Sequence, residues 1–405
     1  MYIALLGRQP ELSIAELERV FTTVSWFSSN TALIRRDTTP DIQRLGGSQK
    51  IGRVTHQLTT TDWRRVSDAV VKHYSQTWAG NDGKITLGIS AYGFTVSPRD
   101  VQKIGLLLKG KLKQSGASLR LIPNQEASLS TATAHHNKLG LSANKIELII
   151  VKGRTTTIVA ESCGAQNITA LAARDQGRPR RDAFVGMLPP KLAQMMINIA
   201  IGDTANQTPN QTPNQTPSSH SGPSRWRILD PFCGTGVLLQ EAMLLGYDAY
   251  GTDLSEKMIR YSNDNLEWLQ KTAHTDTSWI LSEGDATTTR WQSPISAVAS
   301  EAYLGQPFSA PPSAAKLTEV RGNCNHIIGT FLKNIAAQLA PGTPVVVGVP
   351  AWRDSAGRFT HLPLTQKVEH YGFERMTLTT VDSSALLYAR PEQVVARELL
   401  LLIKK

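Results

Sequence analysis

Two glycines and two carboxylates lie close together in the stretch LDPFCGTGVLLQEAMLLGYDAYGTDLS, residues 229–255. Asp230 ends one apolar run, Gly234 and Gly236 follow it, and Asp253 ends a second short apolar run. Glycine permits a tight turn with positive φ and a close approach of the backbone to a ligand. The residue three positions after Gly236 is leucine, which disfavours a dinucleotide site, and the Gly-Lys-Ser/Thr of a Walker loop is absent.

The carboxylates suit a ligand without phosphate. Asp253 fits an acceptor for both hydroxyls of a ribose, Asp285 fits an acceptor for an adenine amine, and Asp230 fits a partner for an α-amino group. In an open parallel sheet, ligands bind at the carboxyl ends of the strands, which is where all three acids are expected. An adenosine joined to an amino acid meets these requirements, so the residues predict S-adenosylmethionine as the cofactor.

Alternating strands and helices position these residues. The patterns predict an apolar strand at 226–230 and further strands around YDAYGTD, WILSEGDA, AVASEAYLG and PVVVGVP. Helices are expected at 191–201, 237–245, 256–269 and 324–339, and the apolar runs 385–388 and 394–403 predict a closing antiparallel hairpin. Such alternation indicates an α/β fold with a mostly parallel, doubly wound sheet.

The N-terminal half predicts a separate α/β module with a basic surface. We expect a helix over 98–114 with Val101, Ile104, Leu107, Leu108 and Leu112 on one apolar face, and strands before and after it. The whole basic excess lies here: residues 1–203 carry 26 Lys and Arg against 15 Asp and Glu, whereas residues 204–405 carry 17 against 18. This asymmetry favours binding of a polyanion by the first half, although ordinary solubility charge is the alternative.

The remaining composition excludes several classes of protein. No apolar run is long enough to cross a membrane, and the first residues lack the basic start of a secretory signal. Three widely spaced cysteines form neither a disulfide framework nor a zinc pattern, so we expect a cytoplasmic protein without a metal. The Asn-Gln-Thr-Pro repeats of 204–224 predict a disordered loop within the second half.

Beyond these patterns, the chain resembles a known family in three stretches. ARDQGRPRRDAFVGMLPPKLAQMMINIA (173–200), the glycine turn of 229–255 and the closing LLYARPEQVVARELLLLIKK resemble the THUMP-domain tRNA guanine-N2 methyltransferases that modify position ten, a class I S-adenosylmethionine-dependent family. The likeness covers most of the chain, and its most specific part is 173–200.

The resemblance implies a domain order and a cofactor site. It implies an N-terminal domain (1–65), a THUMP-like RNA-binding domain (66–165) and a Rossmann-like methyltransferase domain (166–405) with a seven-stranded sheet. The cofactor residues that it implies are Asp230, Pro231, Cys233, Gly234, Gly236, Asp253, Leu254, Asp285 and Ala286, with Leu188–Pro190 packed over the site.

One motif departs from the family. An Asp-Pro-Pro-Tyr sequence is expected at the end of the fourth strand, and this chain has AVASEAYLGQPF there. Either Ser300 replaces the aspartate and Tyr303 matches the tyrosine, or Glu301 is the acid and the tyrosine is shifted by one residue. We predict that Glu301 accepts hydrogen bonds from the target amine and that Tyr303 stacks on the base.

The expected substrate is RNA. The basic residues predicted to hold tRNA, or another structured RNA, are Lys103, Lys109, Lys111, Lys113, Arg178, Arg180 and Arg181. A small activator subunit is a further expected partner. Two alternatives stay open: an RNA-binding protein with an altered or inactive methyltransferase domain, and a methyltransferase that acts on rRNA or DNA.

Overall fold

The computed structural model describes residues 1–182, 188–203 and 225–405, which form two compact units. The first unit contains Met1–Pro10 and Thr23–Ala170, and the second contains Glu11–Thr22 and Leu171–Lys405. The loop predicted at 204–224 lies outside the described residues. The domain boundaries predicted after residues 65 and 165 stay a prediction, and the two units are described separately below.

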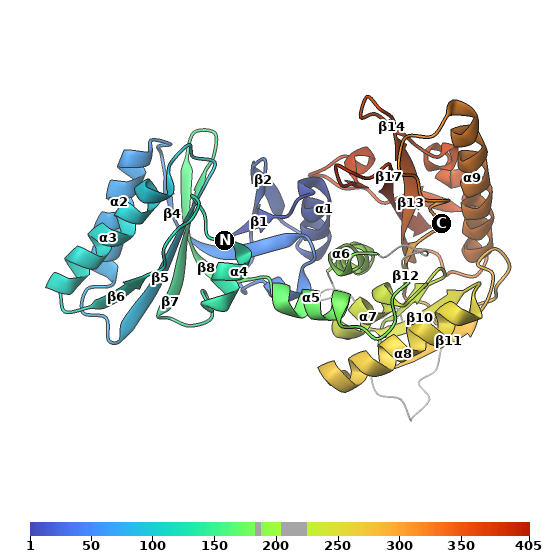
Figure 1. The fold of residues 1–405 in the computed structure, drawn as a ribbon, viewed down its shortest axis with the longest axis horizontal. Coiled ribbons are helices and arrows are strands. Elements are labelled where there is room, and N and C mark those ends of the chain that lie inside the picture. Colours follow the sequence, from blue (N-terminus) through green and yellow to red (C-terminus); the bar gives the residue numbers. More distant parts are fainter. Residues whose placement is uncertain (183–187, 204–224) are drawn as a thin grey trace. The chain divides into compact units, whose positions relative to one another are not determined.

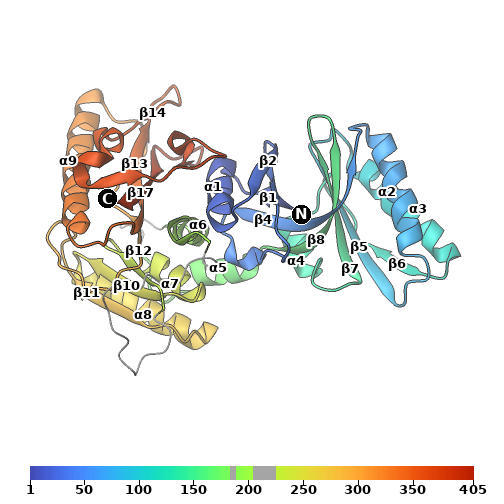
Figure 2. The same ribbon diagram turned by 180° about the vertical axis from the view of Figure 1, so that it is seen from behind.

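The first unit is built on one eight-stranded sheet with the order β2-β3-β1-β4-β8-β7-β5-β6. Only the β5 pairs are parallel, with β6 on one side and β7 on the other. Figures 1 and 2 show β6 at one edge of this sheet and the two long helices α2 and α3 side by side over one face. The elements are β1 (Tyr2–Leu6), β2 (Val24–Ser28), β3 (Thr31–Ile34), β4 (Ser48–Leu58), α2 (Trp63–Thr77), β5 (Lys84–Tyr92), α3 (Pro98–Gln114), β6 (Ser118–Leu121), α4 (Thr131–His136), β7 (Lys145–Lys152) and β8 (Thr157–Ala165).

The helix α3 begins and ends at the predicted residues, but its buried face differs from the prediction. Ser97 and Asp100 form a capping box that satisfies free backbone N–H groups at the helix start. The buried residues are Val101, Ile104, Gly105, Leu108 and Leu112. Leu107 is 54% exposed, so its predicted place on the apolar face was wrong. It lies about 100° around the helix from Leu108, outside the stripe that faces the sheet.

The second unit is built on a mixed sheet with the main order β11-β10-β9-β12-β13-β17-β15. Strands β11, β10, β9, β12 and β13 are parallel, and β17 runs antiparallel to β13. The short β16 pairs with β17 and closes the predicted hairpin, and the short β14 pairs with β13. The strands are β9 (Arg227–Asp230), β10 (Asp248–Asp253), β11 (Trp279–Glu283), β12 (Ala297–Glu301), β13 (Pro344–Arg353), β14 (Phe359–Thr360), β15 (Phe373–Arg375), β16 (Leu387–Tyr388) and β17 (Val395–Lys404).

Helices cover both faces of this second sheet (Figures 1 and 2). Residues of α6, α7 and α1 form one core with alternate residues of β12, β13 and β17, and α9 forms the core on the opposite face. The helices are α1 (Pro10–Val20), α5 (Ile168–Gln176), α6 (Pro190–Ile201), α7 (Val237–Leu244), α8 (Glu256–Ala273) and α9 (Ala314–Ala336). This is the doubly wound arrangement with a closing hairpin that the sequence predicts, but the sheet has nine strands rather than seven, because the short β14 and β16 pair with β13 and β17.

Helix α9 begins ten residues before its predicted start at Cys324. The side chain of Ser313 accepts a hydrogen bond from the backbone N–H of Lys316 and caps the helix there. The first turns are mostly polar and contribute only Val320 to the buried side, so hydrophobic periodicity did not reveal them. None of the helices in the described ranges is long and apolar enough to cross a membrane.

Candidate active site

A cavity of about 740 Å³ lies at the carboxyl ends of the parallel strands in the second unit. The residues that follow β9, β10, β11 and β12 line it, together with one side of α9. It brings together most of the site residues predicted from the sequence: Asp230, Pro231, Cys233, Gly234, Asp253, Leu254, Asp285, Ala286, Glu301 and Tyr303, with Leu188 from the Leu-Pro-Pro segment. Gly236 is a predicted site residue that does not line the cavity.

The glycine turn is held from behind by α8. Gly234 and Gly236 both have positive φ, 52° and 80°. A Cβ on Gly236 would lie 2.9 Å from the Oγ of Ser262, so this glycine is required by close packing against α8. The Ser262 hydroxyl donates to the Gly234 carbonyl (2.8 Å), and the Asn265 amide donates to the Thr235 carbonyl (2.8 Å). The turn is therefore fixed before any ligand binds.

Asp253 connects the ends of β9 and β10. One carboxylate oxygen accepts a hydrogen bond from the backbone N–H of Gly234 (2.9 Å), and the other accepts from that of Ser255 (2.9 Å). A carboxylate has about four acceptor positions, so two amides leave capacity for the two hydroxyls of a ribose. Asp285 is exposed and accepts from the backbone and the hydroxyl of Thr287, and these hydrogen bonds lower the pKa of Asp285.

Asp230 is the most strongly perturbed carboxyl group of the site. It is 3% exposed and accepts hydrogen bonds from the Ser300 hydroxyl (2.6 Å) and the backbone N–H of Phe232 (3.2 Å). Burial raises the pKa of Asp230 to about 7, and the nearby acids Asp253 and Glu301 add to the effect. Such a group at a cavity is a functional candidate on physical grounds.

The altered motif after β12 places Glu301 and Tyr303 in the same cavity. Tyr303 is 41% exposed, so its ring is accessible at the cavity surface. Glu301 forms an ion pair with Arg397 of β17. Arg397 was not among the predicted residues, although a charged Arg-Glu pair inside the apolar run of the closing strand was a signal. His326 and Thr330, one turn apart on α9 and both at the cavity, were not predicted either.

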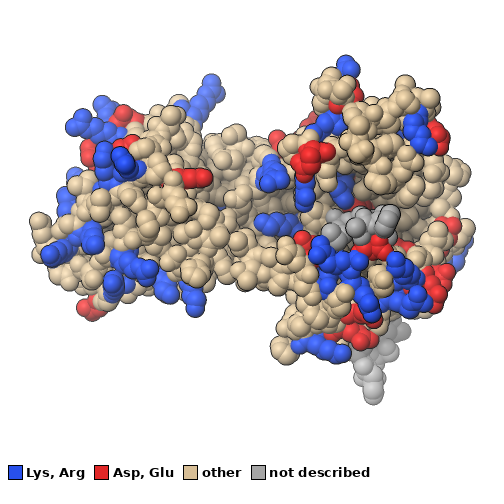
Figure 3. Space-filling view, viewed as in Figure 1, with Lys and Arg blue, Asp and Glu red and all other residues tan. Residues whose placement is uncertain are grey.

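The predicted RNA-binding residues fall into two groups. Lys103, Lys109, Lys111 and Lys113 are exposed along α3, and Figure 3 shows Lys and Arg side chains spread over the surface of the first unit. In the second unit, Arg181 is exposed and Arg180 forms an ion pair with Asp264 (2.6 Å).

Arg178 differs from the other predicted RNA-binding residues because it is 3% exposed. Its guanidinium nitrogens have no hydrogen-bond partner within the described chain, and burial lowers the pKa of Arg178.

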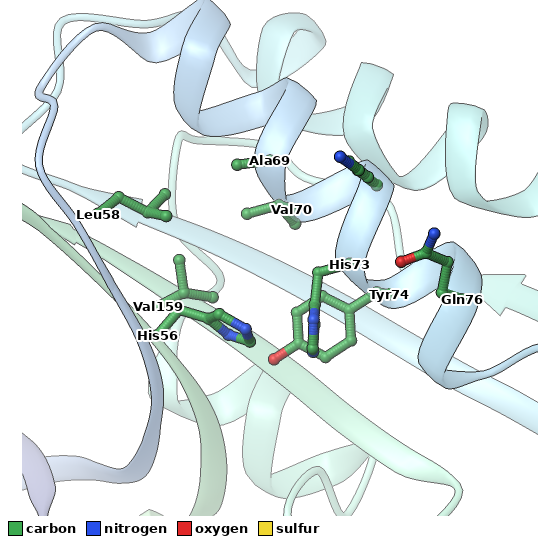
Figure 4. Close-up of a pocket in the computed structure, with 9 residues that line it drawn as sticks. His56, Leu58, Ala69, Val70, His73, Tyr74, Gln76 and Val159 are labelled. Atoms are coloured by element: carbon green, nitrogen blue, oxygen red, sulfur yellow. The ribbon is translucent and has the colours of Figure 1, made fainter.

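A second, smaller cavity of about 250 Å³ lies in the first unit, between α2 and the strands β4 and β8 (Figure 4). The rings of His56 and His73 lie with their centroids 3.8 Å apart, next to Tyr74. Burial and the neighbouring His73 lower the pKa of His56. No group of three or more His, Cys, Asp or Glu in the described ranges could hold a metal ion.

Comparisons with known proteins support a methyltransferase relationship. No family model matches the chain. It is 28% identical over 182 residues to the tRNA (guanine(10)-N2)-dimethyltransferase of Methanothermobacter thermautotrophicus. The matched region covers 44% of each of the two chains. It is 29% identical over 135 residues to the enzyme of the same name from Pyrococcus abyssi, covering 32% of this chain and 30% of that one. The chain thus spans less than half the length of the curated relatives it matches.

The fold comparison covers the whole chain. TrmN from Thermus thermophilus matches with a TM-score of 0.53 and 15% identity, over 100% of this chain and 99% of that one. At 15% identity this likeness concerns the fold alone, and it agrees with the predicted α/β arrangement. The sequence matches confirm the predicted resemblance: over part of its length the chain is similar to two proteins named tRNA (guanine(10)-N2)-dimethyltransferase.

Proposed function

We propose that this protein transfers a methyl group from S-adenosylmethionine to a base of RNA, and that the target is the exocyclic N2 of a guanine in tRNA. The observation that carries the proposal is the single cavity that joins the glycine turn and three carboxylates at strand ends to Glu301 and Tyr303. The names of the sequence relatives support the choice of tRNA and of guanine N2.

The chemistry of the cavity fits this cofactor. Its volume lies in the range typical of small-molecule sites. Asp230, Asp253, Asp285 and Glu301 line it, whereas no Lys or Arg is among its described lining residues. An acidic cavity of this kind disfavours a phosphate and favours a ligand with positive charge. We infer that Asp253 holds the ribose, that Asp285 and Ala286 lie next to the adenine, and that Asp230 faces the amino acid part.

The target amine needs activation because its lone pair is delocalised into the ring. The cofactor supplies an electrophilic methyl group on a positively charged sulfur. Glu301 accepts a hydrogen bond from the amine, which favours a pyramidal nitrogen and frees the lone pair, and Tyr303 stacks on the base. With the cofactor bound, Glu301 and Tyr303 would hold the amine nitrogen in line with the methyl group, and the methylated nitrogen would release its proton to water.

RNA recognition belongs to the first unit in this proposal. Residues 66–165 act as a THUMP-like domain, and the exposed lysines of α3 contact phosphates without reading sequence. We place the protein in the cytoplasm, in keeping with its three free cysteines.

The test is a methyl-transfer assay with labelled S-adenosylmethionine on unmodified tRNA, rRNA and DNA, followed by mass spectrometry of the nucleosides. We expect N2-methylguanosine from tRNA, and a Glu301→Gln variant that binds the cofactor but transfers methyl much more slowly. Labelled methyl found only in rRNA or only in DNA would mean that this nucleic acid, and not tRNA, is the substrate. Activity of the isolated chain would mean that no small activator subunit is required.

A second candidate function is RNA binding without methyl transfer. The altered motif after β12 favours it, because Ser300 stands where the family's aspartate is expected if Tyr303 matches the tyrosine. This alternative predicts tight tRNA binding, no labelled product with any nucleic acid, and weak or absent binding of S-adenosylmethionine in calorimetry.

A further inference from the structure

The ion pair between Glu301 and Arg397 joins two segments that are 96 residues apart in the sequence. Glu301 is the last residue of β12 and lines the cavity, whereas Arg397 belongs to β17. Both side chains are largely removed from water, with 15% of Glu301 and 9% of Arg397 exposed. Burying an ion pair costs desolvation energy, so stability alone is a weak explanation for this pair. Its position at the cavity indicates a role in the site.

Strand β13 lies between the two residues, and its register places them on one face of the sheet. In the sheet, Glu301 lies opposite Gly348 of β13, and Gly348 lies opposite Leu399 of β17. Arg397 is two residues from Leu399, so strand alternation puts it on the same face as Glu301. A Cβ at Gly348 would contact Leu399 (3.6 Å), Met196 (3.7 Å) and the Cα of Glu301 (3.8 Å). The guanidinium of Arg397 thus reaches across β13 to Glu301.

The backbone after Glu301 is held by a second contact. The N–H of Ala302 donates a hydrogen bond to the carbonyl of Gly348 (3.0 Å), and Ala302 is 3% exposed. A proline at this position would have no N–H and would restrict the backbone through its ring instead. The chain thus restrains this strand end with a cross-strand hydrogen bond.

We infer that Arg397 is a positioning residue, which holds the Glu301 carboxylate in the orientation that accepts a hydrogen bond from the target amine. This inference rests on the proposed function. Glutamate has one more rotatable bond than aspartate, so its carboxylate needs an external restraint to reach the precision that transfer requires. The guanidinium binds one oxygen of Glu301, which leaves acceptor positions on the carboxylate free for the amine.

The experiment measures single-turnover methyl transfer to unmodified tRNA for the wild type, Arg397→Met, Arg397→Lys, Glu301→Gln and the Glu301→Gln/Arg397→Met double variant. We expect Arg397→Met to lower the rate at saturating cofactor and tRNA by about tenfold or more. The dissociation constant for S-adenosylmethionine should stay within about twofold, because Arg397 does not line the cavity. Arg397→Lys should recover part of the rate, because it keeps the charge.

The double variant separates positioning from a general structural role. If Arg397 acts through Glu301, adding Arg397→Met to Glu301→Gln should slow transfer by no more than about twofold further. A full effect of Arg397→Met in the Glu301→Gln background would overturn the inference, as would a single variant with the wild-type rate.

A crystal structure of Arg397→Met tests the pairing without any activity. Glu301 in more than one rotamer supports the inference, and Glu301 in its original single rotamer overturns it. A wild-type protein that transfers methyl to no nucleic acid would contradict the proposed function, and the crystal structure would still decide whether Arg397 positions Glu301.

Discussion

Two buried acids, Glu147 in the first unit and Asp230 in the second, differ in whether a cation lies beside them. In the first unit, Glu147 and Lys50 are almost completely buried, at 0% and 1% exposed, and lie 2.5 Å apart. Ser90 also donates to Glu147, and Lys50 donates to the carbonyl of Leu129. Burial opposes the charge on Lys50, but the attraction of Glu147 raises the pKa of Lys50 above its ordinary value. The charges compensate each other, and neither residue lines a cavity described above.

In the second unit, Asp230 is buried without a cation. Its hydrogen-bond partners are a hydroxyl and a backbone N–H, its pKa is raised to about 7, and it lines the large cavity. Burial of a charged group therefore does not by itself mark a functional site. A compensated pair inside a core serves the fold, whereas an acid that lacks a cation at a cavity is ready for a positively charged ligand.

The largest expected effect tests the compensated pair. Replacing Lys50 with methionine leaves Glu147 as an unpaired buried charge, which should destabilise the first unit by about 3–5 kcal/mol. Urea denaturation with hydrogen exchange of the β4 and β7 amides measures this. The double variant Lys50→Met/Glu147→Leu is the control and should recover much of the loss. A single variant that is as stable as the wild type would show that the Lys50–Glu147 pair does not stabilise the first unit.

The next effect concerns Asp230 and pH. The folded state keeps the proton on Asp230 up to about pH 7, whereas the unfolded chain releases it near pH 4. The free energy of unfolding should therefore fall as the pH rises from about 4 to about 7, by up to about 4 kcal/mol from this group. Asp230→Asn cannot ionise and should lack this contribution. Urea denaturation of both proteins at about pH 5 and pH 8 measures it, and parallel pH dependences would contradict the raised pKa.

A smaller effect tests the ribose contact of the proposed function. Asp253→Ala should weaken binding of S-adenosylmethionine by about 1–3 kcal/mol, because a buried hydrogen-bonded contact is lost. Calorimetry measures the affinity. Asp248 begins the same strand at its opposite end, so Asp248→Ala is the matched control and should bind normally. If the Asp253 variant binds S-adenosylmethionine with unchanged affinity, Asp253 does not contact the cofactor.

The smallest effect concerns the exposed charges of the first unit. Lys111→Ala should weaken tRNA binding by less than about 1 kcal/mol and should reduce the salt dependence of binding by about one unit of slope. Lys271→Ala removes an exposed lysine of α8 in the second unit and serves as the control. Equal salt dependences for the two variants and the wild type would show that α3 does not contact RNA phosphates.

Much of the second unit was predictable because its signals are local. Gly234 and Gly236 require positive φ, the acids stand at the ends of short apolar runs, and the alternation of strands and helices indicates the sheet. The start of α9 was not predictable from apolar periodicity, because its first turns are polar and a serine cap begins them. The place of Leu107 was missed because an apolar side chain within a helix does not specify which way it faces.

The sequence by itself determined the glycine turn, the carboxylates at the strand ends and the basic charge of the first half, since each depends on residues near one another in the chain. Only the tertiary structure decided that Ser300 contacts Asp230, that α9 contributes His326 to the cavity and that Arg397 reaches Glu301. These contacts depend on strand order and register, which bring together side chains from distant segments. A sequence pattern does not specify which strands pair with one another, so such contacts can be identified only from the folded sheet.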